Sequence, residues 1–162
     1  MVKLNRGGNM EIERKFLLNG KIDLEELEYE DIVQGYVSLE PEVRVRSKGG
    51  KYYRTSKGDG DMIREEREKE ISCTMYNILM ENREGGILEK RRYYMPYGNY
   101  IIEIDVYKRS LEGLIVCEVE FPTEKEAVAF MPPDFLGKDV TSDKRYKNKN
   151  LASTGKIPDL NE

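Results

Sequence analysis

The segment EIERKF at residues 11–16 constrains the fold of this 162-residue chain more than any other feature. Residues two apart on an extended strand point to the same side, so Glu11, Glu13 and Lys15 share one face. The residues between them share the other face. A single strand of this kind is typical of a sheet with one solvated face. Repetition of the pattern on many strands instead favours a fold with a charged interior.

The same alternation recurs along the rest of the chain. Six further segments place charged or polar residues two apart on one face: Arg44 and Arg46; Tyr53, Thr55 and Lys57; Glu66, Glu68 and Glu70; Lys90 and Arg92; Glu103 and Asp105; Glu118 and Glu120. Like charges at this spacing repel each other and contribute nothing to folding. They become useful when a charged ligand and a cation lie between them, so the pattern indicates a binding site built from several strands.

The expected fold class is mainly β with flanking α, a closed eight-stranded antiparallel β-barrel with a polar, charged lumen. A barrel of this size has room for packed side chains or one small ligand. Its apolar outer face needs cover, which we expect from helices near residues 72–84, ended by the glycine pair at 85–86, and near 123–131. One or two helical turns are also expected within residues 21–31. An open sheet with helices on one side and solvent on the other is the structural alternative.

Composition limits the class of partner. The chain has 27 Lys and Arg against 31 Asp and Glu, a net charge of −4, and the two signs are interleaved. This balance argues against a protein that coats nucleic acid or an anionic membrane. There is no long apolar run and no charged-then-apolar start, so we expect neither a membrane span nor a signal peptide, and a cytoplasmic location. Cys73 and Cys117 are too few for a disulfide scaffold, and the sequence leaves a homodimer open.

The chain contains no histidine. This absence excludes Ser-His-Asp and Cys-His catalysis and every metal site with a histidine ligand. A bound metal must therefore be held by carboxylates and water, which favours Mg²⁺ or Mn²⁺ as the cofactor.

Basic and acidic residues on the predicted strands suit different parts of one ligand. Six bases match a polyanion, because arginine forks and lysines bind phosphate oxygens; they are Lys15, Arg44, Arg46, Lys57, Lys90 and Arg92. Carboxylates such as Glu11 and Glu13 would repel a polyanion unless they hold a divalent cation that bridges to it. Bases for phosphate combined with acids for metal are the components of phosphoryl transfer.

Taken in order, the motifs resemble the signature of the CYTH superfamily, the triphosphate tunnel metalloenzymes. The matching motifs are E-x-E-x-K at 11–15, QGY at 34–36, R-x-R at 44–46, T-x-K at 55–57, R-x-E-x-E at 64–68, K-x-R at 90–92, E-x-D at 103–105, E-x-E at 118–120 and VTSDKRYKNKNLA at 140–152. The resemblance covers nearly the whole chain. It implies one tunnel domain at 10–152, preceded by an extension at 1–9 and followed by a tail at 153–162.

The resemblance also implies a role for each matching residue. The implied metal ligands are Glu11, Glu13, Glu118 and Glu120, assisted by Asp105. The implied triphosphate binders are Lys15, Arg44, Arg46, Lys57, Lys90 and Arg92. Glu66 and Glu68 would hold a second metal or orient water. A base from the C-terminal segment would join Lys57 on the reacting phosphates, and among Lys144, Arg145 and Lys147 we favour Arg145.

The family comprises inorganic triphosphatases, thiamine triphosphatases, class IV adenylyl cyclases and RNA or nucleotide triphosphatases. Selectivity for a base or thiazole needs an aromatic or apolar pocket, and the chain has no tryptophan and no visible site of that kind. We therefore expect hydrolysis of inorganic tripolyphosphate, a small triphosphate-containing molecule, to pyrophosphate and phosphate. The alternatives are a class IV adenylyl cyclase, then a thiamine or nucleoside triphosphatase, or a non-catalytic polyphosphate-binding module.

Overall fold

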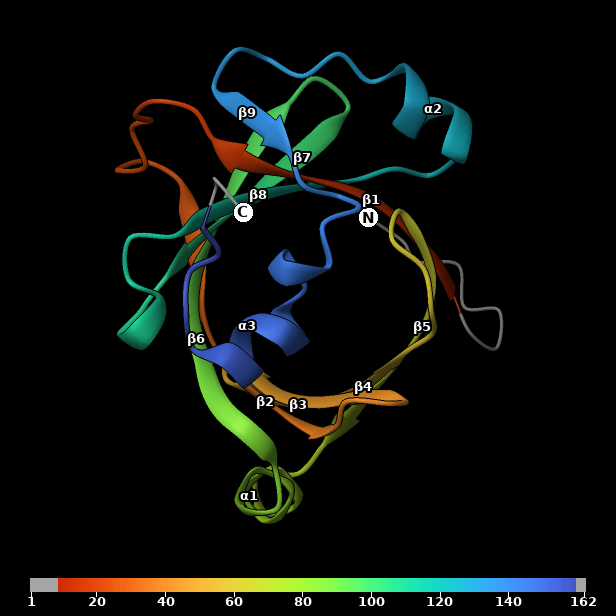
Figure 1. Cartoon of the computed structure of the whole chain (residues 1–162), viewed down its shortest axis with the longest axis vertical. Helices are drawn as coiled ribbons and strands as arrows, with labels where there is room; N and C mark the ends of the chain where they lie inside the picture. The colour runs from red at the N-terminus through yellow and green to blue at the C-terminus, as the bar shows by residue number, and fades with distance from the viewer. Residues whose placement is uncertain (1–8, 160–162) are drawn as a thin grey trace.

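Nine antiparallel strands form one sheet, and eight of them close into a barrel in the computed structural model, which describes residues 9–159 (Figure 1). The strands are β1 (Asn9–Leu18), β2 (Glu28–Ser38), β3 (Glu42–Lys48), β4 (Lys51–Lys57), β5 (Ile63–Ile71), β6 (Glu84–Tyr97), β7 (Tyr100–Tyr107), β8 (Ile115–Glu120) and β9 (Leu136–Asp139). Around the barrel their order is β5-β4-β3-β2-β6-β7-β8-β1, and β1 pairs with β5 to complete the circle. The predicted eight-stranded closed barrel is confirmed.

Strand β1 closes the barrel by using its two edges differently. One edge pairs with β8 from Glu13 to Leu17. The other edge pairs first with β5, over residues 9–12, and then with the short strand β9, at Phe16 and Leu18. Because every segment of β1 has partners, its charged face is held rigidly toward the barrel interior.

Two helices cover the apolar outer face, as expected. Helix α1 (Cys73–Glu81) begins at Ser72, whose hydroxyl accepts a hydrogen bond from the Met75 backbone N–H, and it packs on β2–β4 around Val45. Helix α2 (Glu124–Ala129) covers β1, β7 and β8 around Phe16. None of the helices in the described part of the chain is long and apolar enough to cross a membrane.

Two local predictions were wrong. Residues 21–27 form no helix, and β2 begins at Glu28, because its first residues pair with β6 from Glu28 opposite Tyr94 onward. Helix α1 ends at Glu81, and the glycine pair at 85–86 belongs to β6. A Cβ atom on Gly86 would lie 3.1 Å from the Ala152 carbonyl oxygen, so the glycines allow the C-terminal helix to approach the strand closely.

The C-terminal segment packs inside one end of the barrel. Its short helices, η2 (Lys144–Tyr146) and α3 (Asn148–Thr154), lie within the ring of strands in Figure 1. Tyr146 and Leu151 contact an apolar layer that includes Tyr36, Leu88 and Val116 from the barrel wall. Helix α3 extends two residues into the predicted tail. The barrel interior is therefore divided into an apolar plug at one end and a charged chamber beyond it.

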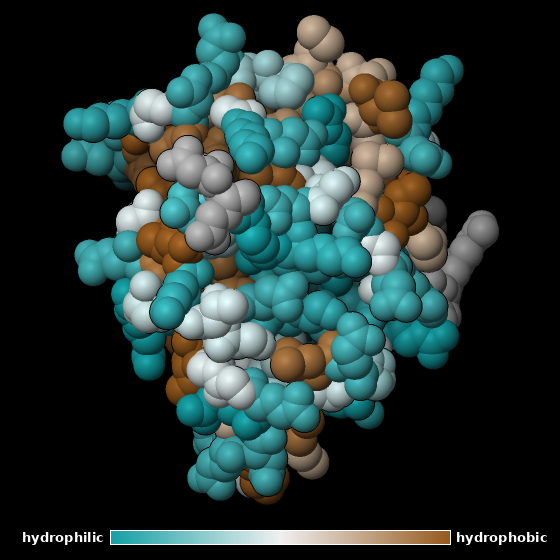
Figure 2. Space-filling model, viewed as in Figure 1, coloured by the Kyte–Doolittle hydropathy of each residue, from teal (hydrophilic) through white to brown (hydrophobic). Residues whose placement is uncertain are grey.

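A further 3-10 turn, η1 (Arg109–Leu111), joins β7 to β8. Seen along the barrel, mostly hydrophilic side chains cover the centre of the molecule (Figure 2). The first eight and last three residues of the chain, which include most of the predicted extension and part of the tail, lie outside the described residues.

Candidate active site

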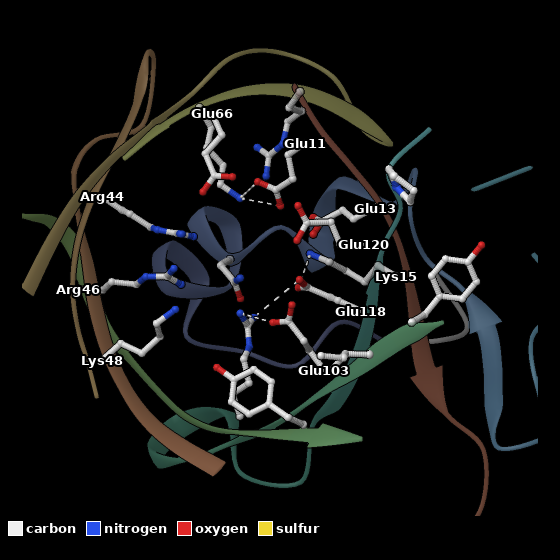
Figure 3. A pocket seen from close by; sticks show the side chains of 18 of the residues that line it. Glu11, Glu13, Lys15, Arg44, Arg46, Lys48, Glu66, Glu103, Glu118 and Glu120 are labelled. Atoms are coloured by element: carbon white, nitrogen blue, oxygen red, sulfur yellow. Dashed lines mark hydrogen bonds and ion pairs between the residues drawn. The ribbon is translucent and has the colours of Figure 1, made fainter. Parts of the chain in front are cut away.

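A cavity of about 690 Å³ occupies the charged part of the barrel (Figure 3). Every barrel strand except β2 contributes at least one charged side chain to its lining: Glu11, Glu13, Lys15, Glu42, Arg44, Arg46, Lys48, Lys57, Arg64, Glu66, Arg92, Glu103, Glu118 and Glu120. Strand β2 contributes Tyr36 instead. The cavity therefore combines many acids and bases within one chamber, and their arrangement decides what it can bind.

Strand β3 forms a basic wall. Arg44, Arg46 and Lys48 point from it into the cavity on one side of Figure 3. Arg44 and Arg46 are only 5% and 6% exposed, and the Nε atom of each is buried without a hydrogen-bond partner. Burial, with repulsion from Arg44 and Arg92, lowers the pKa of Arg46 to about 10. Buried donors without acceptors are costly, so this wall is suited to an anion.

The acidic wall comes from β1 and β8. Glu13 lies directly opposite Glu120 in the strand register, and Lys15 lies opposite Glu118. Burial, together with repulsion from Glu118 and Glu11, raises the pKa of Glu13 well above its usual value. Such crowding of carboxylates is unfavourable without a cation between them.

One lysine links the acidic wall to the rest of the lining. Lys57 Nζ lies 3.3 Å from Glu11 Oε2. Although burial opposes the change, this lysine lowers the pKa of Glu11 well below its usual value. Apart from this ion pair, the buried Glu11 Oε2 atom accepts no hydrogen bond, so it is available to a cation.

Below the cavity floor, Asp105 binds two cations at once. Lys90 Nζ donates to Asp105 Oδ2 at 2.7 Å, and Arg92 donates to both carboxylate oxygens at 2.8 and 2.9 Å. Arg92 also pairs with Glu103 and lies 3.7 Å from Glu118. Asp105 is fully buried. Its carboxylate is thus occupied by side chains and orients the guanidinium that faces the cavity.

Comparison with known proteins shows which family the chain belongs to. The inorganic triphosphatase of Nitrosomonas europaea is 42% identical to this chain over 147 residues, which are 88% of this chain and 96% of that protein. This chain belongs to the inorganic triphosphatase family. The family member from Acetivibrio thermocellus is 36% identical over 151 residues, 87% of this chain and 92% of that protein. No family model matches the chain.

Solved structures agree with this family assignment. The crystal structure of the inorganic triphosphatase NE1496 superimposes with a TM-score of 0.67 at 38% identity, covering 92% of this chain and 97% of that chain. The Hippeastrum protein HpAC1, at 14% identity and a TM-score of 0.63, shares the fold. The resemblance to the CYTH superfamily drawn from the motifs is therefore confirmed.

Ten of the predicted site residues come together in the triphosphatase cavity: Glu11, Glu13, Lys15, Arg44, Arg46, Lys57, Glu66, Arg92, Glu118 and Glu120. Four do not line it. Lys90 and Asp105 form the buried pair beneath its floor. Glu68 accepts a hydrogen bond from Thr55 at 3.1 Å and lies 3.5 Å from Arg46, so it supports the basic wall.

Arg145 is the fourth, and the structure places it away from the cavity lining. Its guanidinium donates two hydrogen bonds to Asp143, at 3.0 and 2.8 Å, and one to the Asp159 carbonyl oxygen. Lys147 is also engaged elsewhere, donating to the Gly60 carbonyl oxygen and pairing with Asp61. The C-terminal segment instead presents Asn148 to the cavity. In this structure Arg145 does not line the cavity, because Asp143 binds its side chain, and its contact with phosphate stays a prediction.

Five charged lining residues received no role in the sequence analysis: Glu42, Lys48, Arg64, Glu103 and Glu126. Glu126 lies on helix α2; the other four each lie two positions from a predicted site residue on the same strand, and Glu42 and Arg64 form a buried ion pair at 3.1 Å. The alternation that found the other residues therefore contained the signal for these four as well. Arg64 and Glu103 already belonged to the matching motifs, and one further inward position at each end of R-x-R would have identified Glu42 and Lys48.

The acidic wall fits a hard divalent cation in its chemistry. Its donors are all carboxylate oxygens, which Mg²⁺ and Mn²⁺ prefer. The buried Glu11 Oε2 atom accepts no hydrogen bond and could coordinate the cation. The bound cation would also relieve the repulsion between Glu13 and its neighbouring carboxylates. Among residues 9–159, no three acidic side chains are already gathered in metal-binding geometry. Binding would therefore require side-chain rotation in this wall.

Proposed function

We propose that this protein hydrolyses inorganic triphosphate to pyrophosphate and phosphate inside the barrel, with Mg²⁺ or Mn²⁺ as cofactor. The observation that carries the proposal is the division of one cavity into a basic wall with unpaired guanidinium donors and an acidic wall of crowded carboxylates. The relatives of 42% and 36% identity, both inorganic triphosphatases, support the same reaction.

The basic wall would bind the phosphate chain. Arg44 and Arg46 offer planar forks that suit phosphate oxygens, and Arg92 is held in place for the same purpose by Asp105. Lys15 is anchored between the Tyr146 carbonyl oxygen, at 3.1 Å, and Glu118, at 3.7 Å. These fixed charges neutralise the substrate and require little reorganisation during the reaction, which is how positioned dipoles and charges stabilise a transition state.

The acidic wall would hold the metal through Glu11, Glu13, Glu118 and Glu120. When bound, the cation supplies charge neutralisation and Lewis acidity at the phosphate oxygens. Asp105 is excluded from this ligand set in our proposal, because both of its oxygens already accept hydrogen bonds from Lys90 and Arg92.

Glu66 and Lys57 would complete the reacting centre. Both line the cavity, and they face each other across the β4–β5 pairing. We assign Glu66 to orient the attacking water and Lys57 to stabilise the phosphate that it attacks. Glu68 acts indirectly, by positioning Arg46 through their ion pair. Catalysis of this kind depends on positioning and electrostatics, and it needs no histidine.

A substrate panel tests the proposal. Purified protein is incubated with tripolyphosphate, ATP or thiamine triphosphate, each with Mg²⁺ or Mn²⁺, and phosphate, pyrophosphate and cyclic AMP are measured. We expect phosphate and pyrophosphate in equal amounts from tripolyphosphate, and slower release from the two esters. Cyclic AMP from ATP would instead identify a cyclase. Tight tripolyphosphate binding without turnover of any substrate would identify a polyphosphate-binding module.

A further inference from the structure

The basic wall is longer than a triphosphate needs. Lys48 follows Arg44 by four residues on β3, and at the usual rise per residue their Cα atoms are about 13 Å apart along the strand. All three inward side chains, Arg44, Arg46 and Lys48, line the same cavity. A chain of three phosphorus atoms is shorter than this row, so Arg44 and Arg46 can be occupied while Lys48 still faces open space.

Lys48 lies at the end of the row farthest from the plug. Strand β3 starts at Glu42, beside a smaller pocket that Lys147 and Lys149 of the C-terminal segment help to line. Arg44 pairs with Tyr36, which belongs to the apolar layer around the plug, whereas Lys48 pairs with Ile32, four residues farther from that layer along β2. The row Arg44–Arg46–Lys48 therefore runs from the plugged end of the chamber toward its other end.

Lys48 forms no direct ion pair with an acidic side chain among residues 9–159. In the same part of the chain it makes no hydrogen bond, and its ammonium lies 5.9 Å from the centre of the Tyr53 ring. Partial burial and repulsion from Arg46 and Arg92 lower the pKa of Lys48, despite attraction from Glu30 and Glu68. A cation that is half-buried beside two others is stabilised by an anion placed between them.

We propose that Lys48 forms a subsite for a fourth phosphate, so that the cavity takes a linear inorganic tetraphosphate as well as a triphosphate. This inference rests on the proposed function for the binding mode of the first three phosphates. In the subsite, the Lys48 ammonium donates hydrogen bonds to the outermost phosphate, while Arg44 and Arg46 hold phosphates deeper in the chamber. No covalent role is assigned to Lys48.

The chain offers a matched control. Lys51 lies directly opposite Lys48 across the β3–β4 pairing, but it is exposed and does not line the cavity. Lys51→Met removes the same charge from the same rim of the barrel without removing a ligand from the subsite. Comparing it with Lys48→Met separates direct contact from general attraction of polyanions.

The experiment is calorimetric titration of tripolyphosphate and tetrapolyphosphate into the protein in EDTA, so that no metal or turnover contributes. We expect the wild-type protein to bind tetraphosphate more tightly, and Lys48→Met to weaken tetraphosphate binding about tenfold while changing triphosphate binding less than about twofold. Lys51→Met should preserve the preference. Equal weakening of both anions by Lys48→Met, equal effects of the two variants, or no preference in the wild-type protein would each overturn the subsite.

Failure of the proposed function gives a different result. If the wild-type protein binds tetraphosphate preferentially through Lys48 but does not hydrolyse tripolyphosphate with Mg²⁺ or Mn²⁺, the subsite stands and the enzymatic proposal fails. If hydrolysis is observed without a Lys48-dependent preference, the enzymatic proposal stands and the subsite fails.

Discussion

Replacing Asp105 with asparagine should destabilise the protein strongly. Asp105 is fully buried and accepts three hydrogen bonds from Lys90 and Arg92, at 2.7 to 2.9 Å. The asparagine has the same shape, but it leaves two buried cations short of one negative charge and turns an amide N–H₂ toward one of them. Removal of one partner from a buried ion pair costs about 3–5 kcal/mol. For a protein of this size, that loss lowers Tm by roughly 6–20 °C.

Urea unfolding followed by circular dichroism measures the loss, and Asp31→Asn is the control. Asp31 accepts hydrogen bonds from Arg91 at 2.8 and 3.2 Å, a similar geometry, but on the exposed outer surface. Exposed pairs contribute about 0–1 kcal/mol, so the control should change little. If Asp105→Asn loses no more stability than Asp31→Asn, the reasoning that Asp105 serves as a buried anchor for two cations is refuted.

Three further predictions follow from the same structure. Burial lowers the pKa of Lys90 to about 8, so between pH 8 and the ordinary lysine pKa the unfolded chain binds a proton that the folded protein lacks, and the free energy of unfolding should rise with pH. Lys90→Met should lack this rise in urea unfolding curves measured across that pH range. Burial raises the pKa of Cys117 to about 12, whereas Cys73 is exposed, so iodoacetamide at pH 8 should label one thiol in the native protein and two after unfolding; rapid labelling of Cys117 in the native protein would show that the barrel wall opens. Ser72→Ala removes the hydroxyl that accepts the Met75 N–H at 3.1 Å and should cost about 1 kcal/mol in urea unfolding, while an unchanged midpoint would mean that water replaces the cap.

The sequence was sufficient to predict the barrel because the alternation of charges is dictated by strand geometry. Glu11, Glu13 and Lys15 had to share a face, and the same held for the pairs on the other strands. The alternation does not indicate how far along the lumen each side chain lies. Lys90 and Arg92 share a face of β6, yet Arg92 lines the cavity, whereas Lys90 lies beneath its floor with 1% of its surface exposed. Depth depends on strand tilt and on the plug.

The differences between expectation and structure have local physical causes. The acidic segment at 21–31 has a helical composition, but its last residues gain strand pairing with β6, and tertiary context overrides propensity. Arg145 was favoured among neighbouring bases by resemblance alone, and sequence spacing could not show that Asp143 would cap the 3-10 turn and bind its side chain. Strand β9 was not predicted because its four residues carry no alternation of their own.

Metal-free calorimetry on two variants tests the central claim, that one wall binds phosphate and the other binds metal. Tripolyphosphate is titrated in EDTA into the wild-type protein, Arg44→Met and Glu118→Gln. The account predicts that Arg44→Met weakens binding about tenfold or more, because a buried charged donor is lost, and that Glu118→Gln binds as tightly as the wild-type protein or tighter, because a nearby negative charge is removed. Weakening by Glu118→Gln equal to that by Arg44→Met would contradict the division of the cavity into two walls.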